Sequence, residues 1–168
     1  MANTYTLIEA KTLASATATV SFTSIPQTYT DLKVVCSVRS TRSGDAENLY
    51  IGFNSSASSF SSRNMIGEGS GTPAGYSTLN QFIGVVNGDT SIANTFCNNE
   101  IYIPNYTSSN YKSFSGDGVQ EANQTLAYAT LTAGLWSNTA AITSIDFTVQ
   151  FTTIKTGSTF YLYGISNS

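Results

Sequence analysis

The chain has 168 residues, a formal net charge of −3 and only 10% charged residues, which fits a single domain with one core. Its seven lysines and arginines are scattered rather than clustered, and no apolar run approaches the ~20 residues of a membrane span, so nucleic-acid binding and membrane insertion are not expected. Because the chain has no histidine, catalytic triads that contain histidine and most zinc sites are excluded.

Apolar and polar residues alternate with period two along most of the chain, which predicts strands with one buried and one exposed face. The first strand is expected at residues 5–10 and the second at 16–22, after which Pro26 interrupts the pairing. Further strands are expected at 31–39, 48–53, 81–86, 95–103, 111–115, 125–135, 143–152 and 159–165.

Two segments between these strands carry other signals. The alternation disappears over residues 54–76, which predicts a long loop and the first place to look for contacts. Asn87-Gly88-Asp89 predicts a hairpin turn after the strand at 81–86. About ten strands without an amphipathic helix indicate an all-β fold, and we expect one antiparallel two-sheet β-sandwich of jelly-roll type over residues 1–168.

The apolar sides of the alternating runs predict the core. In the run from Ile145 to Phe151, for example, every second residue is apolar and the residues between are polar. The predicted core residues are Val20, Phe22, Leu32, Val34, Val38, Leu49, Ile51, Phe53, Ile101, Ile103, Ile145, Phe147, Val149 and Phe151.

The residues that could carry chemistry are sparse. Cys36 and Cys97 lie in predicted strands and are expected to be buried free thiols, with no metal site, since no CxxC motif is present. Glycoside hydrolysis needs two carboxylates across a cleft, but no spacing brings two of the candidates together. We therefore expect no enzyme activity and no cofactor. The carboxylates considered are Asp45, Glu47, Glu68, Glu100, Asp117 and Glu121.

Tyrosine is the most suggestive surface residue, with ten in the chain. The spacing of five of them places some rings on an outer face, where they could form a protein interface or stack on a sugar. Alternatively, the rings cap sheet edges and fill gaps between strands. The five candidates are Tyr102, Tyr106, Tyr111, Tyr161 and Tyr163.

Several segments together resemble a known group of proteins: ATVSFTSIPQTYTDLKVV near the start, NTFCNNEIYIPNY in the middle, and LTAGLWSNTAAITSIDFTVQF followed by STFYLYGI at the end. The ensemble resembles the small all-β virion proteins of tailed bacteriophages, which include jelly-roll-like capsid cement or decoration proteins and tail or fibre modules. The resemblance covers most of the chain except residues 54–76, and it rests on strand and turn patterns rather than on a catalytic motif.

The resemblance implies a structural role in a virion that assembles in the host cytoplasm, and the start of the sequence, which lacks the features of a secretory signal, agrees with this. The favoured role is a capsid cement that binds the major capsid protein as a homo-oligomer, with a trimer preferred. The alternative is a tail or fibre adhesion module, or a carbohydrate-binding module that contacts host glycans.

Docking on a lattice is expected to use apolar and tyrosine contacts and a strand edge rather than salt bridges, because the chain has so few charges. Residues 1–6 are short of charge and β-prone. They are expected either to pair with a neighbouring subunit or to form the first strand of their own sheet.

Overall fold

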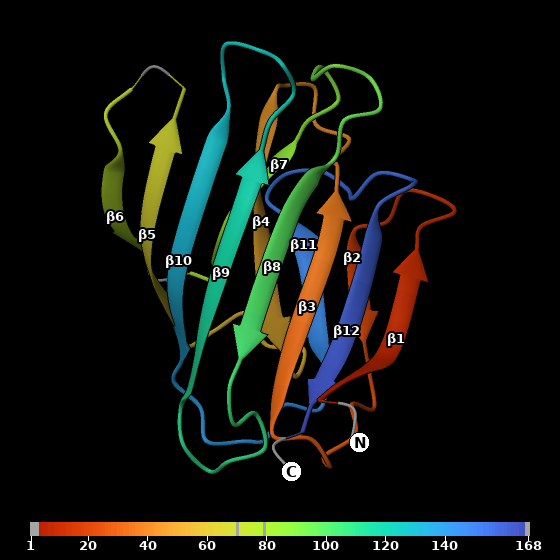
Figure 1. The fold of residues 1–168 in the computed structure, drawn as a ribbon, viewed down its shortest axis with the longest axis vertical. Coiled ribbons are helices and arrows are strands. Elements are labelled where there is room, and N and C mark those ends of the chain that lie inside the picture. Colours follow the sequence, from red (N-terminus) through yellow and green to blue (C-terminus); the bar gives the residue numbers. More distant parts are fainter. Residues whose placement is uncertain (1–3, 70, 79, 167–168) are drawn as a thin grey trace.

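The computed structural model describes residues 4–69, 71–78 and 80–166. This part of the chain forms twelve strands and no helix (Figure 1). The strands are β1 (Tyr5–Thr12), β2 (Thr19–Phe22), β3 (Asp31–Val38), β4 (Ala46–Phe53), β5 (Phe60–Glu68), β6 (Ala74–Thr78), β7 (Phe82–Asn87), β8 (Cys97–Ile103), β9 (Lys112–Gln120), β10 (Tyr128–Trp136), β11 (Ile145–Val149) and β12 (Thr159–Ile165).

The strands form two antiparallel sheets that pack face to face. The large sheet has eight strands in the order β1-β12-β3-β8-β9-β10-β5-β6, and the small sheet has four in the order β2-β11-β4-β7. Figure 1 shows the small sheet behind the large one, with β5 and β6 at the far side from β1. The predicted all-β, two-sheet antiparallel sandwich is therefore confirmed, with twelve strands in place of about ten.

The prediction of a long loop over residues 54–76 is wrong, because this segment contains β5 and the first part of β6. Buried and exposed residues alternate in β5, but some of its buried residues are polar and one of its exposed residues is apolar. The inward residues include Ser62 and Asn64, which are buried, whereas Met65 points outward. A search for apolar residues on a buried face does not recognise such a strand.

The predicted hairpin at Asn87-Gly88-Asp89 is also wrong. β7 pairs with β4, and the next strand, β8, lies in the other sheet. Gly88 instead packs against the loop before β4, where its N–H donates to the carbonyl oxygen of Asp45. A Cβ atom on Gly88 would lie 1.9 Å from the carbonyl oxygen of Gly44, so this close approach requires glycine.

The predicted core is buried with the exception of Phe151, which is 66% exposed. β11 ends at Val149, and the carboxylate of Glu47 accepts the N–H groups of Phe151 and Thr152, which turns the chain away from the sheet. The Phe151 ring then lies over the Arg42 guanidinium, with Cζ 5.1 Å from the ring centroid. Assigning Phe151 to the core was therefore wrong.

An aromatic cluster joins the two sheets at one end of β5, β9 and β10. Trp136 and Phe114, from β10 and β9, meet Phe53 of β4 edge-on at centroid distances of 5.6 and 5.5 Å, and Phe60 of β5 stacks on Trp136. Such ring pairs add to the stability gained from burial alone. This cluster anchors β9, β10 and β5 to the small sheet.

The opposite end of the same strands has a polar interior. The Gln120 side chain donates to Asn87 Oδ1 at 2.6 Å, and Asn99 Nδ2 donates to Cys97 Sγ. Asn99 lies between Gly84 and Gly118, where added Cβ atoms would come within 2.2 and 2.1 Å of its Oδ1. Several buried polar atoms of this interior lack a hydrogen-bond partner among the described residues, namely Asn64 Oδ1, Asn87 Nδ2, Asn99 Oδ1, Gln120 Oε1 and Thr132 Oγ1.

Both cysteines are buried and free, as expected. Burial raises the pKa of the Cys36 thiol well above its usual range, and that of Cys97 to about 12. Both thiols are therefore protonated and unreactive at neutral pH.

Candidate interaction surface

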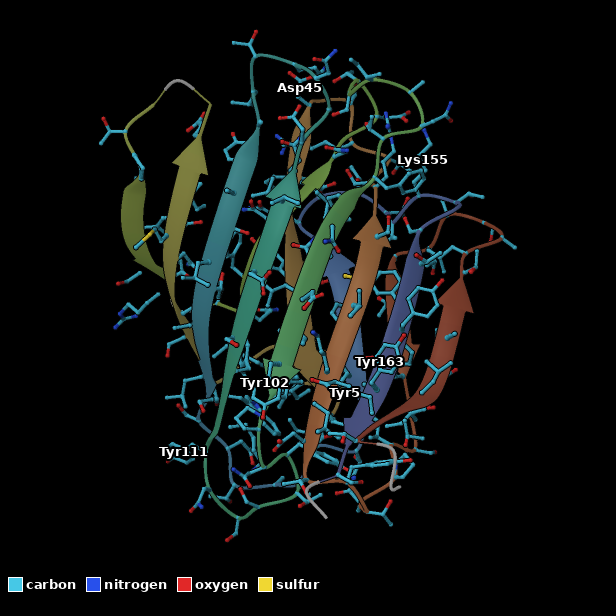
Figure 2. The ribbon with its side chains drawn as sticks, viewed as in Figure 1. Tyr5, Asp45, Tyr102, Tyr111, Lys155 and Tyr163 are labelled. Atoms are coloured by element: carbon cyan, nitrogen blue, oxygen red, sulfur yellow. The ribbon has the colours of Figure 1, made fainter. Side chains whose placement is uncertain are left out.

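Three of the five predicted tyrosines lie on the outer side of the large sheet. Tyr161 and Tyr163 alternate with the buried Phe160 and Leu162 on β12, so their rings face away from the small sheet. Strand pairing places Lys33 of β3 between Tyr163 and Tyr102, opposite each of them. Figure 2 shows Tyr102, Tyr5 and Tyr163 over the same part of the sheet.

Strand β1 extends this surface. Leu7 pairs with Tyr163, and Leu7 and Tyr5 are 51% and 54% exposed. We name the resulting surface the tyrosine face. It consists of Tyr5, Leu7, Lys33, Tyr102, Tyr161 and Tyr163.

The remaining two predicted tyrosines lie elsewhere. Tyr106 is fully buried and its hydroxyl donates to the carbonyl oxygen of Pro26, so its assignment to an interface is wrong and it fills a gap in the core. It follows β8 in a connecting segment, where strand spacing does not fix the direction of a side chain. Tyr111 is 59% exposed but lies just before β9, apart from the tyrosine face (Figure 2).

Hydrogen bonds hold the polar groups of the tyrosine face in place. The Tyr102 hydroxyl donates to Asp31 Oδ2 at 2.7 Å, and Asp31 Oδ1 accepts the N–H of Asn105 at 2.8 Å. The hydrogen bond to Asp31 is the main reason that the pKa of Tyr102 rises to about 12. Lys33 Nζ lies 2.6 Å from Glu100 Oε2, and this contact raises the pKa of Lys33.

The tyrosine face is therefore aromatic with few charges, most of which are carboxylates. Tyr102 is fixed as a protonated donor to Asp31, the Lys33 charge is matched by Glu100, and Asp117 lies beside Glu100. Aromatic rings with a polar tip are common in protein interfaces, where they bury a large area with few rotatable bonds.

A second exposed surface lies on the same side of the sheet over β9, β10 and β5. Leu131 pairs with Met65, and they are 56% and 59% exposed. Beside them, Ala129 pairs with Val119, which is 49% exposed. We name Met65, Val119, Ala129, Leu131 and Ala133 the apolar patch. Monomeric proteins rarely leave large apolar side chains together in solvent without a functional reason.

The sequence pattern did not predict the apolar patch, because β10 turns its apolar side to solvent and its polar side to the interior. Its apolar positions, such as Leu131, face solvent, whereas Thr130 and Thr132 are 6% and 1% exposed and face inward. The signal was present as the alternation of residues 127 to 135, but alternation does not tell which side of a strand is covered.

The two edges of the large sheet differ. β1 has a bulge between Leu7 and Glu9, and Lys11 lies on its inward side with Nζ 5.5 Å from the centroid of the Phe22 ring. A bulge and an inward charge both oppose pairing with another chain. β6, at the other edge, has the uncharged sequence AGYST and no bulge in its pairing with β5.

The segment 1–6 was expected either to pair with a neighbour or to begin its own sheet. Residues 1–3 lie outside the described part of the chain. Tyr5 and Thr6 belong to β1 and pair with Ile165 and Gly164 of β12, so in them the second alternative is observed.

The structure brings two pairs of the candidate carboxylates together, contrary to the expectation from their spacing. Glu100 pairs with Asp117 across β8 and β9, and Glu68 and Glu121 line one hollow. The others have local roles. Glu47 is buried and caps the turn after β11, and Asp45 accepts the hydroxyl of Thr90, while Glu100 also forms an ion pair with Lys33. Within residues 4–69, 71–78 and 80–166, no group of three or more His, Cys, Asp or Glu side chains could hold a metal ion.

In the part of the chain that the structure describes, no helix is long and apolar enough to cross a membrane. No protein-family model matches the chain, and no curated protein or solved structure shows significant similarity to it.

Proposed function

We propose that this chain is a structural virion protein of a tailed bacteriophage, namely a capsid cement protein that binds the major capsid protein lattice and stabilises the shell. The observation that carries the proposal is the tyrosine face, an aromatic surface with few charges on the outer side of the large sheet. The resemblance of the sequence to phage virion proteins supports the same role.

We also infer that the sandwich is of jelly-roll type. Without the β5–β6 and β9–β10 hairpins, two four-stranded sheets remain, in the orders β1-β12-β3-β8 and β2-β11-β4-β7. Along the chain, β1, β2, β3 and β4 alternate between the sheets, and β11 and β12 lie in opposite sheets. This is the arrangement expected of two interlocked Greek keys, which viral capsid and lectin domains use.

The tyrosine face is the surface proposed to contact the capsid. Tyr102 is already fixed by Asp31, so less conformational freedom is lost on docking. Many weak copies of such a contact give strong attachment through avidity across the lattice. The protein then acts in the virion, assembled in the host cytoplasm, as a homo-oligomer for which the resemblance favours a trimer.

The copy number in purified virions tests this role. Quantitative mass spectrometry, with the major capsid protein as internal standard, should find hundreds of copies per particle. A few copies to a few dozen would favour a tail location instead, and absence from the particles would refute the virion role.

Surface variants test the docking face. Tyr163→Ser should reduce binding to capsids prepared without this protein. The control is Tyr50→Ser, which replaces a half-buried tyrosine on the small sheet and should not reduce binding. Raising the salt concentration should release little protein, since screening weakens mainly exposed charge pairs. Equal loss of binding in both variants, or release by moderate salt, would contradict docking through the tyrosine face.

The alternative role, a tail, fibre or carbohydrate-binding module that contacts host glycans, has one favourable observation. A hollow on the outer side of the small sheet is lined by Thr19, Gln81, Asp146 and Thr148, among others. Hydroxyl, amide and carboxylate groups are suited to hydrogen bonds with sugar hydroxyls. Binding on a glycan array that is lost in Asp146→Asn would support this alternative.

A further inference from the structure

We infer that the apolar patch is a docking site for a second copy of this chain, related by a two-fold axis that runs across the strands. This inference goes beyond the proposed function, because it concerns a different surface from the tyrosine face and applies to the purified protein. Three features of the patch point to a second copy.

The first feature is the solvent exposure of the apolar side of β10 and β5. In both strands the side that faces solvent carries the large apolar residues, Leu131 and Met65, and the side that faces inward carries buried polar residues such as Thr132 and Asn64. Burying exposed apolar surface is favourable by roughly 25 cal/mol per Å². A partner that covers this side would recover that free energy.

The second feature is the surface shape of the patch. Leu131 and Met65 form a ridge, and shallow hollows lie on both sides of it along the strands. One hollow is lined in part by Gly67, Ala129 and Pro73, whose side chains are small or absent. Leu131 and Met65 form one row across the strands, and Ala129 and Gly67 form the next. A two-fold axis between these two rows places Leu131 of each copy over Ala129 of the other, and Met65 over Gly67. Such a ridge beside a hollow is complementary to itself, as an isologous interface requires.

The third feature is the distribution of charge. Arg63 lies on the outward side of β5 at one end of the patch, and Asp117 of β9 lies beside Leu131. Glu68 and Glu121 line a further hollow at the other end. None of these four charged residues belongs to a salt bridge found among the described residues. The same two-fold axis reverses the strand direction, so the basic end of each copy meets the acidic end of the other. Complementary charges at the rim fix the register of an interface.

Sedimentation velocity of the purified chain over a range of concentrations tests this inference. The unmodified protein should form a dimer as concentration rises. Leu131→Glu should abolish the dimer, because it places a charge over the apolar hollow, whereas Leu7→Glu on the tyrosine face should leave it intact. Leu7 is the matched control, since both leucines are about half exposed on outer positions of the same sheet.

Charge reversal tests the two-fold register without altering the apolar contacts. Arg63→Glu and Glu68→Arg should each raise the dimer dissociation constant, by roughly tenfold, and the double variant should restore it. A monomer at all concentrations, a trimer that does not pair further into hexamers, or a dimer abolished by Leu7→Glu but not by Leu131→Glu would overturn the inference. Failure of the double variant to restore the dimer would overturn the proposed axis. Circular dichroism of each variant checks that the fold is retained.

Discussion

The two halves of the large sheet follow the same alternation with opposite outcomes. In β1, β12, β3 and β8, apolar side chains such as Leu162 and Ile101 face the small sheet, and tyrosines face solvent. In the middle of β10 and β5, polar side chains such as Thr132 and Asn64 face inward and Leu131 and Met65 face outward, although Trp136 and Phe60 at one end are buried. Of the small sheet, β7 packs along β9 and β10, and β4 adds Phe53 at the end that carries Phe114 and Trp136. The partner opposite a strand, rather than its period, decides which side is buried.

The largest expected effect contrasts a core residue with an outward one. Phe147→Ala should lower the free energy of unfolding by about 3–5 kcal/mol, because it leaves a cavity between Phe22 and Phe160, whereas Leu131→Ala should change it by less than about 0.5 kcal/mol in dilute protein. Urea denaturation measures both. A comparable loss in the two variants would mean that Leu131 is not solvent-facing in the isolated chain.

A second contrast concerns two glycines in the half of the large sheet that contains β9, β10 and β5. Gly118→Ala should destabilise the fold by roughly 1–3 kcal/mol, because its Cβ would lie 2.1 Å from Asn99 Oδ1. Gly67→Ala, on the outer side of β5, should be nearly neutral, since the nearest atom to its Cβ is 4.0 Å away. Thermal unfolding of the two variants provides the measurement. If Gly118→Ala were tolerated equally well, the interior around Asn99 would be looser than described.

A third contrast concerns the polar interior. Thr132→Val should raise the free energy of unfolding by about 1 kcal/mol, because it replaces a buried hydroxyl that has no hydrogen-bond partner among the described residues. Thr130→Val should instead lower it by about 1 kcal/mol, since the Thr130 hydroxyl donates to the Gly118 carbonyl oxygen at 3.3 Å. Chemical denaturation distinguishes the two signs. A loss of stability in Thr132→Val would indicate that its hydroxyl is satisfied.

The smallest expected effect belongs to the tyrosine face and appears only at high pH. The pKa of Tyr102 is raised from 10.0 to about 12, so its contribution to stability is fully present below pH 10 and is lost as the pH rises towards 12. Asp31→Asn should lower this pKa, since it removes the accepting charge. Difference absorbance titration against Tyr102→Phe isolates the signal. An unchanged titration in Asp31→Asn would exclude Asp31 as the cause.

The sequence was sufficient for the fold class, because runs such as Ile145–Val149 alternate cleanly and the small sheet covers their apolar side. It was insufficient for β5, whose buried residues include Ser62 and Asn64. Two features arise from long-range contacts that no local pattern encodes: Glu47 turns the chain before Phe151, and Pro26 accepts the Tyr106 hydroxyl.

The candidate surface was predictable to a similar extent. Alternation places Tyr102, Tyr161 and Tyr163 on one side of their strands, and the structure brings them together through β3. The apolar patch could not be found in this way. Alternation shows that Leu131 and Ala133 share a side, but that this side faces solvent follows only from the packing of β7 on the other one.

The order of strand pairing also determines what the growing chain exposes during synthesis. β1 pairs with β12 and β2 with β11, so neither sheet can be completed until late strands emerge, at about 5–20 residues per second. By contrast, β5–β6 and β9–β10 join neighbours in sequence and can form early. The apolar side of β10 is thus presented before the core is complete, because β11 and β12 follow it in the chain.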